Sequence, residues 1–239
     1  MTTATSATAA HTPVPSAPLV ATARATGLLY LGMGVAGMLG FLLIRPWIFD
    51  PEDPTATLAH LVEHEQLARL GIALGMTHVV LQALTALWFY RLFRTVDAFS
   101  AAAIAGFGLV NSIVVLGSAA FLASALDVAI SPISGAEGDA QLMYVVSDNL
   151  WGVGALGFGL WLIPMGWCVL RSGWMPRLLG WVLIAGGSGY VLSAFVSYLA
   201  PDTGVLAEVL TGPATLGEFW MIGYLLVRGV RRTEARSQG

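Results

Sequence analysis

Six apolar segments, each long enough to cross a bilayer as a helix, follow one another along the chain. A hydrocarbon core about 30 Å thick requires about 20 mainly apolar residues at about 1.5 Å per residue. The predicted spans are Thr22–Ile44, Arg69–Tyr90, Ala98–Leu126, Asp148–Leu170, Leu178–Leu199 and Val205–Val227. The pattern predicts an all-α membrane protein, a bundle of six transmembrane helices that occupies residues 22–230.

The segments outside these spans are polar. Residues 1–21 are rich in Ala, Thr and Pro, a composition that predicts a disordered tail, and residues 231–239 form a short basic tail. Two connections, Arg45–Ala68 and Asp127–Ser147, are long and contain acidic residues and proline. The other three connections are short, so the long and short connections alternate.

The arginines predict the orientation of the bundle. All eleven basic residues are arginine, and with both termini in the cytoplasm only Arg45 and Arg69 lie on the outer side. Cytoplasmic loops of membrane proteins carry an excess of basic residues, which favours this orientation. Arg45, followed by Pro46 and Trp47, is interpreted as a simple stop at the outer interface.

Composition narrows the class of protein further. Of the 239 residues, 56% are hydrophobic and 10% are charged, against about 25% charged in soluble domains. The net charge of -3 and the absence of a basic cluster argue against a nucleic-acid partner, so the lipid bilayer is the expected environment. The single cysteine, Cys168, rules out an intramolecular disulfide and a thiolate metal cluster.

Five short motifs occur in a fixed order along the chain. They are ARATGLLYL at residues 23–31, EQLARLGI at 65–72, YRLF at 90–93, RSGWMPRLLG at 171–180 and LLVRG at 225–229. Their order and spacing resemble a bacterial multi-pass membrane family known as domain of unknown function 4386, over about residues 22–232. The resemblance implies a protein of the bacterial inner membrane and provides no activity to transfer.

The resemblance also marks individual positions. Those that match the family pattern are Arg24, Glu65, Arg69, Pro176, Tyr190 and Glu218. Two positions depart from it: His64 stands where small polar residues are common, and Ser193 stands where the family often has Asp. Chemistry that depended on His64 would therefore be specific to this protein.

Glu218 is the first candidate for a functional residue. It lies ten residues before Arg228, which in a helix is about 15 Å, so its carboxylate is expected near the middle of the membrane. Ionisable side chains are costly there and usually face other helices or a cavity. Thr215 shares a helical face with Glu218 and is a candidate binding residue.

Other polar residues at a similar predicted depth are candidate partners of Glu218. His78 lies near the middle of the second span and shares a helical face with Gln82, and Asn111 lies at a similar depth in the third span. A carboxylate near an imidazole suits proton relay, cation binding or general acid catalysis. Glu218 and His78 are therefore the predicted catalytic pair, with Asn111 and Gln82 as binding residues. The alternative is that these side chains only join helices by hydrogen bonds.

Two further features have weaker functional interpretations. His60, Glu63 and His64 form an H-x-x-E-H pattern found in some zinc peptidases, but a solvated, charged face is the more common explanation, and neither a metal nor another cofactor is expected. Tyr190 lies in the fifth span with other aromatic residues within the membrane, where it lines a cavity for a lipid or simply packs.

Three functions agree with these patterns. The first is a carrier or channel-like protein that handles a proton, a cation or a small solute at a polar site in mid-membrane. The second is an intramembrane enzyme, such as a cyclase, that acts on a lipid or isoprenoid with Glu218 as general acid. The third is an accessory membrane subunit. The carrier interpretation is favoured because no diphosphate-binding or nucleophile motif is present, and the oligomeric state is left open.

Overall fold

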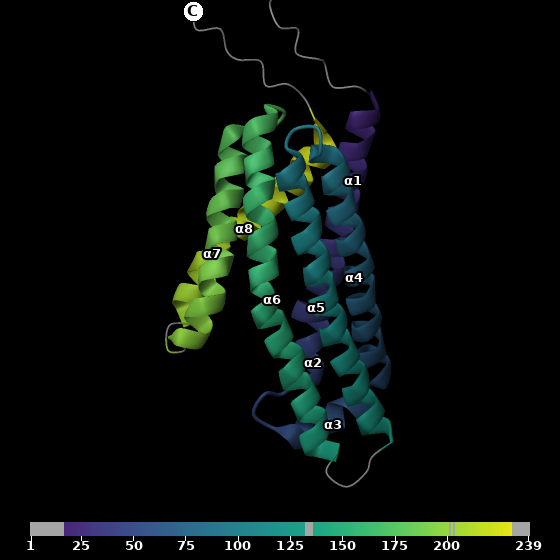
Figure 1. Cartoon of the computed structure of the whole chain (residues 1–239). Helices are drawn as coiled ribbons and strands as arrows, with labels where there is room; N and C mark the ends of the chain where they lie inside the picture. The colour runs from purple at the N-terminus through teal and green to yellow at the C-terminus, as the bar shows by residue number, and fades with distance from the viewer. Residues whose placement is uncertain (1–16, 132–135, 201, 203, 231–239) are drawn as a thin grey trace, which may run out of the picture.

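The computed structural model describes residues 17–131, 136–200, 202 and 204–230, and every regular element in these residues is a helix (Figure 1). The long helices are α1 (Ala17–Gly37), α4 (Glu65–Phe93), α5 (Ala98–Ile130), α6 (Ala136–Ser172), α7 (Arg177–Leu199) and α8 (Gly204–Val227). Helix α1 continues through the π-helical segment η1 (Met38–Ile44) into α2 (Arg45–Ile48). A short helix, α3 (Pro54–Glu63), precedes α4.

Five of these helical segments are long and apolar enough to cross a membrane. They are Pro18–Ile48, Glu65–Phe93, Ala98–Ile130, Ala136–Ser172 and Arg177–Leu199. Helix α8 has the required length and contains Glu208, Pro213 and Glu218, and it is not among these five segments. The prediction of an all-helical, multi-pass membrane protein is confirmed at this level, whereas the sixth span and the orientation of the termini stay predictions.

Several helix boundaries differ from those predicted. Helix α1 begins at Ala17 instead of Thr22, and α6 begins at Ala136 instead of Asp148. The early start of α6 has a packing reason, because Ala140 and Tyr144 bury against Ile48 and Leu61 in an apolar cluster at this end of the bundle. The connection predicted at 45–68 contains α2 and α3. Of the predicted tails, 1–21 and 231–239, residues 17–21 belong to α1, and residues 1–16 and 231–239 lie outside the described part of the chain.

The long helices form a ring in which each helix packs against the next in the sequence (Figure 1). Helix α8 runs obliquely behind α6 and α7 in this view and closes the ring against α1. Helices α1 and α8 approach each other closely at Gly27 of α1, where an added Cβ would lie 2.9 Å from Leu225 Cβ of α8. The ring order makes α1 and α7 the neighbours of α8.

Glycines allow α6, α7 and α8 to pack with their backbones in contact. A Cβ added at Gly187 of α7 would lie 2.7 Å from the carbonyl oxygen of Gly159 in α6. A Cβ added at Gly189 of α7 would lie 2.0 Å from the carbonyl oxygen of Leu210 in α8. Small residues at such crossings are a common means of association between membrane helices, for which burial from water provides little driving force.

The end of the bundle that holds the connections 94–97 and 173–176 is joined by polar and aromatic contacts. Arg171 at the end of α6 forms an ion pair with Asp97, which also caps α5 by accepting a hydrogen bond from the Ser100 amide. The Ser100 hydrogen bond, and then the Arg171 guanidinium, lower the pKa of Asp97 below its ordinary value. Trp174 stacks on Phe93, with ring centroids 6.3 Å apart.

We expect Gly189→Ala to destabilise the bundle, because the added methyl group cannot be accommodated against the backbone of α8. The expected loss in the free energy of unfolding is about 2 kcal/mol, typical of overpacking, measured by thermal unfolding in detergent. Gly223→Ala in α8 is the matched control, since a Cβ there meets no atom within 4 Å. Equal stability of the two variants would contradict the close approach of α7 and α8.

The Asp97–Arg171 ion pair predicts a component of stability that depends on pH. Because folding lowers the pKa of Asp97, its contribution is present at neutral pH and is lost as the pH falls below the ordinary value of 3.8. The unfolding temperature of Asp97→Asn should therefore lie below that of the wild type at neutral pH and approach it in acid. Asp127→Asn, at an exposed position, serves as the control and should show no such convergence.

Candidate functional site

Glu218 borders a large groove between α8 and the neighbouring helices. The groove has a volume of about 610 Å³ and is formed by residues of α1, η1, α6, α7 and α8. Most of its lining is apolar or aromatic, and its hydroxyl and carboxylate side chains are those of Glu218, Thr215, Tyr190 and Asp148. We call this space the lateral groove.

The lateral groove opens on the outer surface of the bundle. Its lining includes Met38 and Leu42 of η1, which are 43% and 60% exposed, and Phe219 of α8, which is 60% exposed. These large apolar side chains border the opening between η1 and α8. In a protein that spans a bilayer, such a rim faces lipid, so the groove is accessible to molecules dissolved in the membrane.

The carboxylate of Glu218 is bound by a tyrosine of α1, the helix against which α8 closes the ring. The Tyr30 hydroxyl of α1 donates a hydrogen bond of 2.5 Å to Glu218 Oε1. Tyr30 is 1% exposed and makes edge-to-face contacts with Phe89 and Trp161, each with ring centroids 5.5 Å apart. No hydrogen bond to Glu218 Oε2 is found among the described residues. Tyr30 thus fixes one carboxylate oxygen of Glu218.

A continuous series of aromatic rings forms one side of the lateral groove. The ring centroids of Phe41 and Trp151 are 4.7 Å apart, those of Trp151 and Phe158 6.3 Å, and those of Phe158 and Tyr190 6.1 Å. All four residues line the groove. Aromatic faces attract cations, so this wall is suited to a cationic or highly polarisable ligand.

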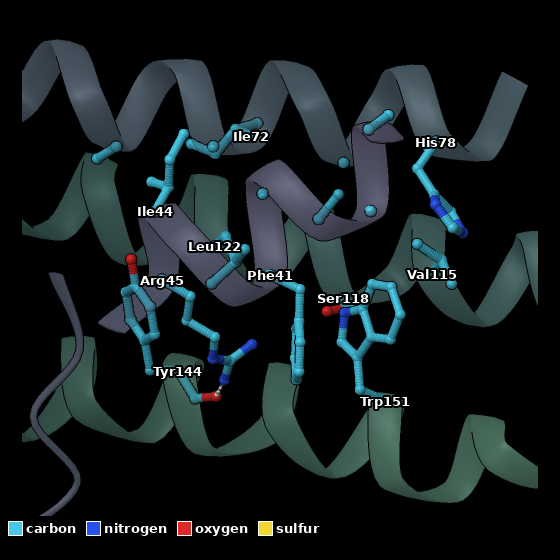
Figure 2. A pocket seen from close by; sticks show the side chains of 17 residues that line it. Phe41, Ile44, Arg45, Ile72, His78, Val115, Ser118, Leu122, Tyr144 and Trp151 are labelled. Carbon is cyan, nitrogen blue, oxygen red and sulfur yellow. Dashed lines mark hydrogen bonds between the residues drawn. The ribbon is translucent and has the colours of Figure 1, made fainter. Parts of the chain in front are cut away.

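A second, much smaller cavity lies on the other side of η1, between η1, α4, α5 and α6 (Figure 2). This inner cavity has a volume of about 40 Å³ and is bordered by His78 at one end and by Arg45 and Tyr144 at the other. His78 is 4% exposed, and its Nδ1 lies 3.0 Å from the carbonyl oxygen of Met33. Its Nε2 has no hydrogen-bond partner among the described residues.

One aromatic pair separates the two cavities. Phe41 and Trp151, together with Gly37, border both the lateral groove and the inner cavity. The Trp151 ring also contacts the His78 ring, with centroids 5.6 Å apart. His78 and Glu218 therefore lie on opposite sides of the Phe41–Trp151 pair.

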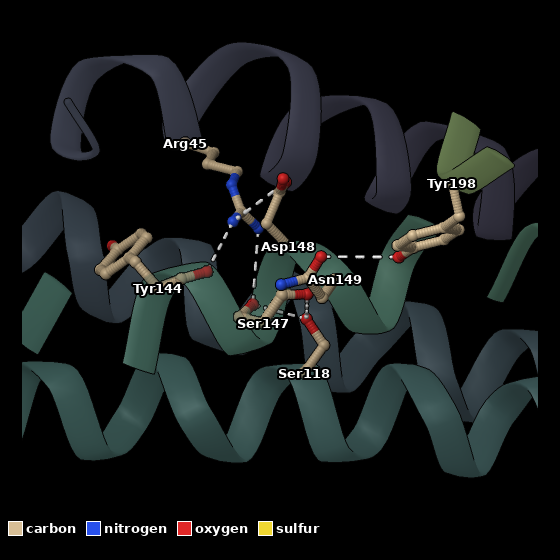
Figure 3. Close-up of polar contacts among 7 residues, drawn as sticks. All are labelled: Arg45, Ser118, Tyr144, Ser147, Asp148, Asn149 and Tyr198. Carbon is tan, nitrogen blue, oxygen red and sulfur yellow. Dashed lines mark hydrogen bonds and ion pairs between the residues drawn. The ribbon is translucent and has the colours of Figure 1, made fainter. Parts of the chain in front are cut away.

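Arg45 lies at the end of the inner cavity opposite His78, within a set of polar contacts with α6 (Figure 3). Its guanidinium lies 3.2 Å from Asp148 Oδ1 and donates a hydrogen bond of 3.1 Å to the carbonyl oxygen of Tyr144. The rings of Phe41, Phe49 and Tyr144 surround it, with centroids 5.2 to 5.6 Å from Arg45 Cζ. Arg45 is only 8% exposed, so this arginine is a packed element of the bundle and not a simple interfacial stop.

The structure brings together some of the predicted site residues and separates others. Glu218, Thr215 and Tyr190 line the same groove, whereas His78 borders the inner cavity. Gln82 and Asn111 are buried and border neither space. The residue that contacts Glu218 is Tyr30, which the sequence analysis did not select. The sequence marked Tyr30 only as part of the motif at residues 23–31, because no spacing rule links residues in the first and last helices.

Asn111 has a packing environment of its own. Its side chain faces glycines of α6, and a Cβ added at Gly157 would lie 2.9 Å from Asn111 Oδ1. Neither atom of its amide group has a hydrogen-bond partner in the described part of the chain. Asn111 thus contacts α6 and not Glu218.

The H-x-x-E-H pattern does not form a metal site in the described residues. The His60 and His64 rings lie 6.3 Å apart. No group of three or more His, Cys, Asp or Glu side chains suited to a metal ion is found in that part of the chain. The pattern occupies the end of α3 and finishes at His64, the residue between α3 and α4 where the helix breaks.

The sequence was also compared with known proteins. No curated protein and no solved structure matches it. The model of a protein family described as domain of unknown function 4386 matches residues 25–229, which extend from α1 to the end of α8. The match covers the motifs that first suggested the resemblance and confirms it. The chain belongs to the domain of unknown function 4386 family.

Proposed function

We propose that the protein is a carrier in the bacterial inner membrane that binds a lipophilic organic cation in the lateral groove and exchanges it for a proton at Glu218. The observation that carries the proposal is a carboxylate within an aromatic groove that opens on the lipid-facing surface. The proposal takes α8 as the sixth membrane span and both termini as cytoplasmic. It thereby places Glu218 near the middle of the bilayer.

The charges around the groove favour a cation. Glu218 and Asp148 are the acidic side chains among the lining residues, and no arginine lines the groove. Asp148 is paired with Arg45, which leaves Glu218 as the unpaired acidic group. The aromatic wall from Phe41 to Tyr190 adds an attraction for positive charge that increases when water is excluded. An anion would meet repulsion here.

The size and lining of the groove favour a lipid-soluble molecule. Its volume of about 610 Å³ falls within the range of about 300–1,000 Å³ for small-molecule sites. The lining is mainly apolar, so a hydrated inorganic ion would lose its water without enough oxygen ligands to replace it. An organic cation with apolar substituents requires no such replacement.

Exchange of the cation for a proton follows from the position of Glu218. A carboxylate in mid-membrane is stabilised either by a bound proton or by a cation beside it. Arrival of the cation therefore favours release of the proton, and departure of the cation favours its return. Tyr30 is a positioning residue in this scheme, because its hydrogen bond to Oε1 fixes the carboxylate at the groove. Tyr190 and Thr215 line the ligand site.

The same aromatic wall supports a second candidate function, an intramembrane enzyme that acts on an isoprenoid. Aromatic faces stabilise carbocations, and Glu218 would supply the proton that starts the reaction. The two functions differ in the fate of the ligand, which a carrier releases unchanged. An accessory subunit, the third alternative, would bind no small molecule in the groove.

The carrier proposal predicts that the purified protein in lipid nanodiscs binds tetraphenylphosphonium, a lipophilic cation. Glu218→Gln removes the negative charge and should weaken binding about tenfold or more, since an ion pair in an apolar site is worth at least about 1.4 kcal/mol. Glu208→Gln is the matched control, because Glu208 lies on the same helix outside the groove. Isothermal titration calorimetry measures both affinities.

Two outcomes would count against the proposal. Equal affinity of the Glu208→Gln and Glu218→Gln variants would mean that the cation does not bind at Glu218. Conversion of a farnesyl or geranylgeranyl compound to a new product, detected by mass spectrometry and lost in Glu218→Gln, would establish the enzyme instead. Proton release on addition of tetraphenylphosphonium, followed with a pH indicator, tests the exchange itself.

A functional carboxylate also predicts a particular pattern of stability. Glu218→Gln retains an oxygen that accepts the Tyr30 hydrogen bond, so its thermal stability in detergent should match that of the wild type. Glu218→Leu leaves the buried Tyr30 hydroxyl without an acceptor and should cost about 2 kcal/mol. A large loss of stability in Glu218→Gln would mean that the charge serves the fold and not a ligand.

A further inference from the structure

We propose that the inner cavity is a water-filled passage through which His78 exchanges protons with the aqueous phase at the Arg45 end of the bundle. This site is separate from the lateral groove, and the inference does not depend on the carrier function. It rests on the shape of the cavity, on the polar groups at its two ends and on the hydrogen bonding of His78.

The inner cavity is elongated along α4. Its lining includes Ala68, Gly71, Gly75 and His78, which follow one another on a single face of that helix. Ten residues from Ala68 to His78 correspond to about 15 Å along the helix axis. The cavity thus extends from near the start of α4, at the end of the bundle that holds Arg45, to the middle of the helix (Figure 2).

Small residues keep this space open on both sides. Gly71 and Gly75 of α4, Gly37 at the end of α1 and Gly40 in η1 all line the cavity, and Gly40 lies against Gly71. At Gly37 an added Cβ would lie 2.8 Å from His78 Nδ1, so larger side chains there would displace the imidazole. The π-helical turn of η1 lies along this stretch, and such turns are often found at functional sites.

The hydrogen bonding of His78 leaves Nε2 able to accept a further hydrogen bond, and the neighbouring Gln82 amide has no hydrogen-bond partner among the described residues either. A carbonyl oxygen only accepts, so the contact with Met33 assigns the hydrogen to Nδ1, and Nε2 of the neutral ring is then an acceptor. Nε2 is buried and has no partner among the described residues. A buried polar atom without a partner is costly, and a water molecule in the adjoining cavity removes that cost.

The cavity has room and polar groups for water. Its volume of about 40 Å³ exceeds the about 10–15 Å³ that a single water molecule needs. Arg45 lines it at the opposite end from His78, and the Ser118 hydroxyl lies between the two ends (Figure 2). A short file of water molecules would connect these groups to Nε2.

No charged side chain of the described residues contacts the His78 ring. The ring lies beside Gly37 of α1 and contacts Trp151 of α6, Val115 of α5 lines the cavity at the same end, and Gln82 is the polar neighbour of His78 on α4. Arg45 is the one arginine that lines the cavity, and it is paired with Asp148. A proton that arrives from the Arg45 end is accepted at Nε2 from water and is returned by the same path.

Exchange of the imidazole C2 hydrogen for deuterium tests this passage. The exchange requires solvent at the ring and is followed by mass spectrometry of peptides from the full chain in detergent. We expect His78 to exchange at a measurable rate despite its burial. The less buried His64 is the reference in the same sample. Absence of exchange at His78 after His64 is complete would overturn the proposal.

Matched variants locate the route that the solvent takes. Gly75→Val fills the inner cavity and should slow exchange at His78 about fivefold or more, because displaced water no longer reaches the ring. Gly34→Val is the control, since Gly34 lines the lateral groove and a Cβ there meets no atom within 4 Å. Unchanged exchange in Gly75→Val, or equal slowing in both variants, would overturn the proposed route.

A further variant covers the case in which Gly75→Val does not fold. A Cβ at Gly75 lies 3.4 Å from Ala119 Cβ, which is an ordinary contact, so Gly75→Ala fits and narrows the cavity by one methyl group. Backbone amide exchange of the same peptide is measured alongside. If His78 exchange fell in parallel with amide exchange, local unfolding and not a water passage would account for it, and the proposal would be wrong.

Discussion

The closure of the helix ring by α8 against α1 is the constraint on which the rest of the structure depends. Helix α8 carries two glutamates and a proline and is not among the five segments found apolar enough to cross a membrane. It is held by backbone contact with the glycines of α7 and by the hydrogen bond from Tyr30 to Glu218. The closure positions the carboxylate at one side of the lateral groove and creates the groove itself.

The sequence predicted the helices far better than their mutual positions. Hydropathy and length identified the long helices, and the distance to Arg228 identified Glu218 as an acid deep within a helix. The partner of Glu218 was not predictable, because Tyr30 lies 188 residues away and the sequence of α1 does not divide into a polar and an apolar face. Which face of such a helix turns inward depends on its neighbours and not on its own pattern.

The expected pairing of His78 with Glu218 did not appear for a topological reason. Depth along the membrane normal can be read from a sequence, but position around a ring cannot. Helix α4 lies between α1 and α5, whereas α8 lies between α7 and α1. The two residues therefore face separate cavities, with η1 and the Phe41–Trp151 pair between them. The wide turn of η1 allows neighbouring residues to face both spaces, a feature that hydropathy does not reveal.

The ring closure also has a consequence for biogenesis. Helices emerge from the ribosome in order, so α1 enters the membrane long before α8 is made. During that interval Tyr30 has no carboxylate acceptor, and its hydroxyl must find a temporary partner in lipid, water or an insertion factor. The arrival of α8 supplies the acceptor and completes the groove in one event. Assembly of the ligand site and completion of the fold thus coincide, and a chain interrupted before α8 would have neither.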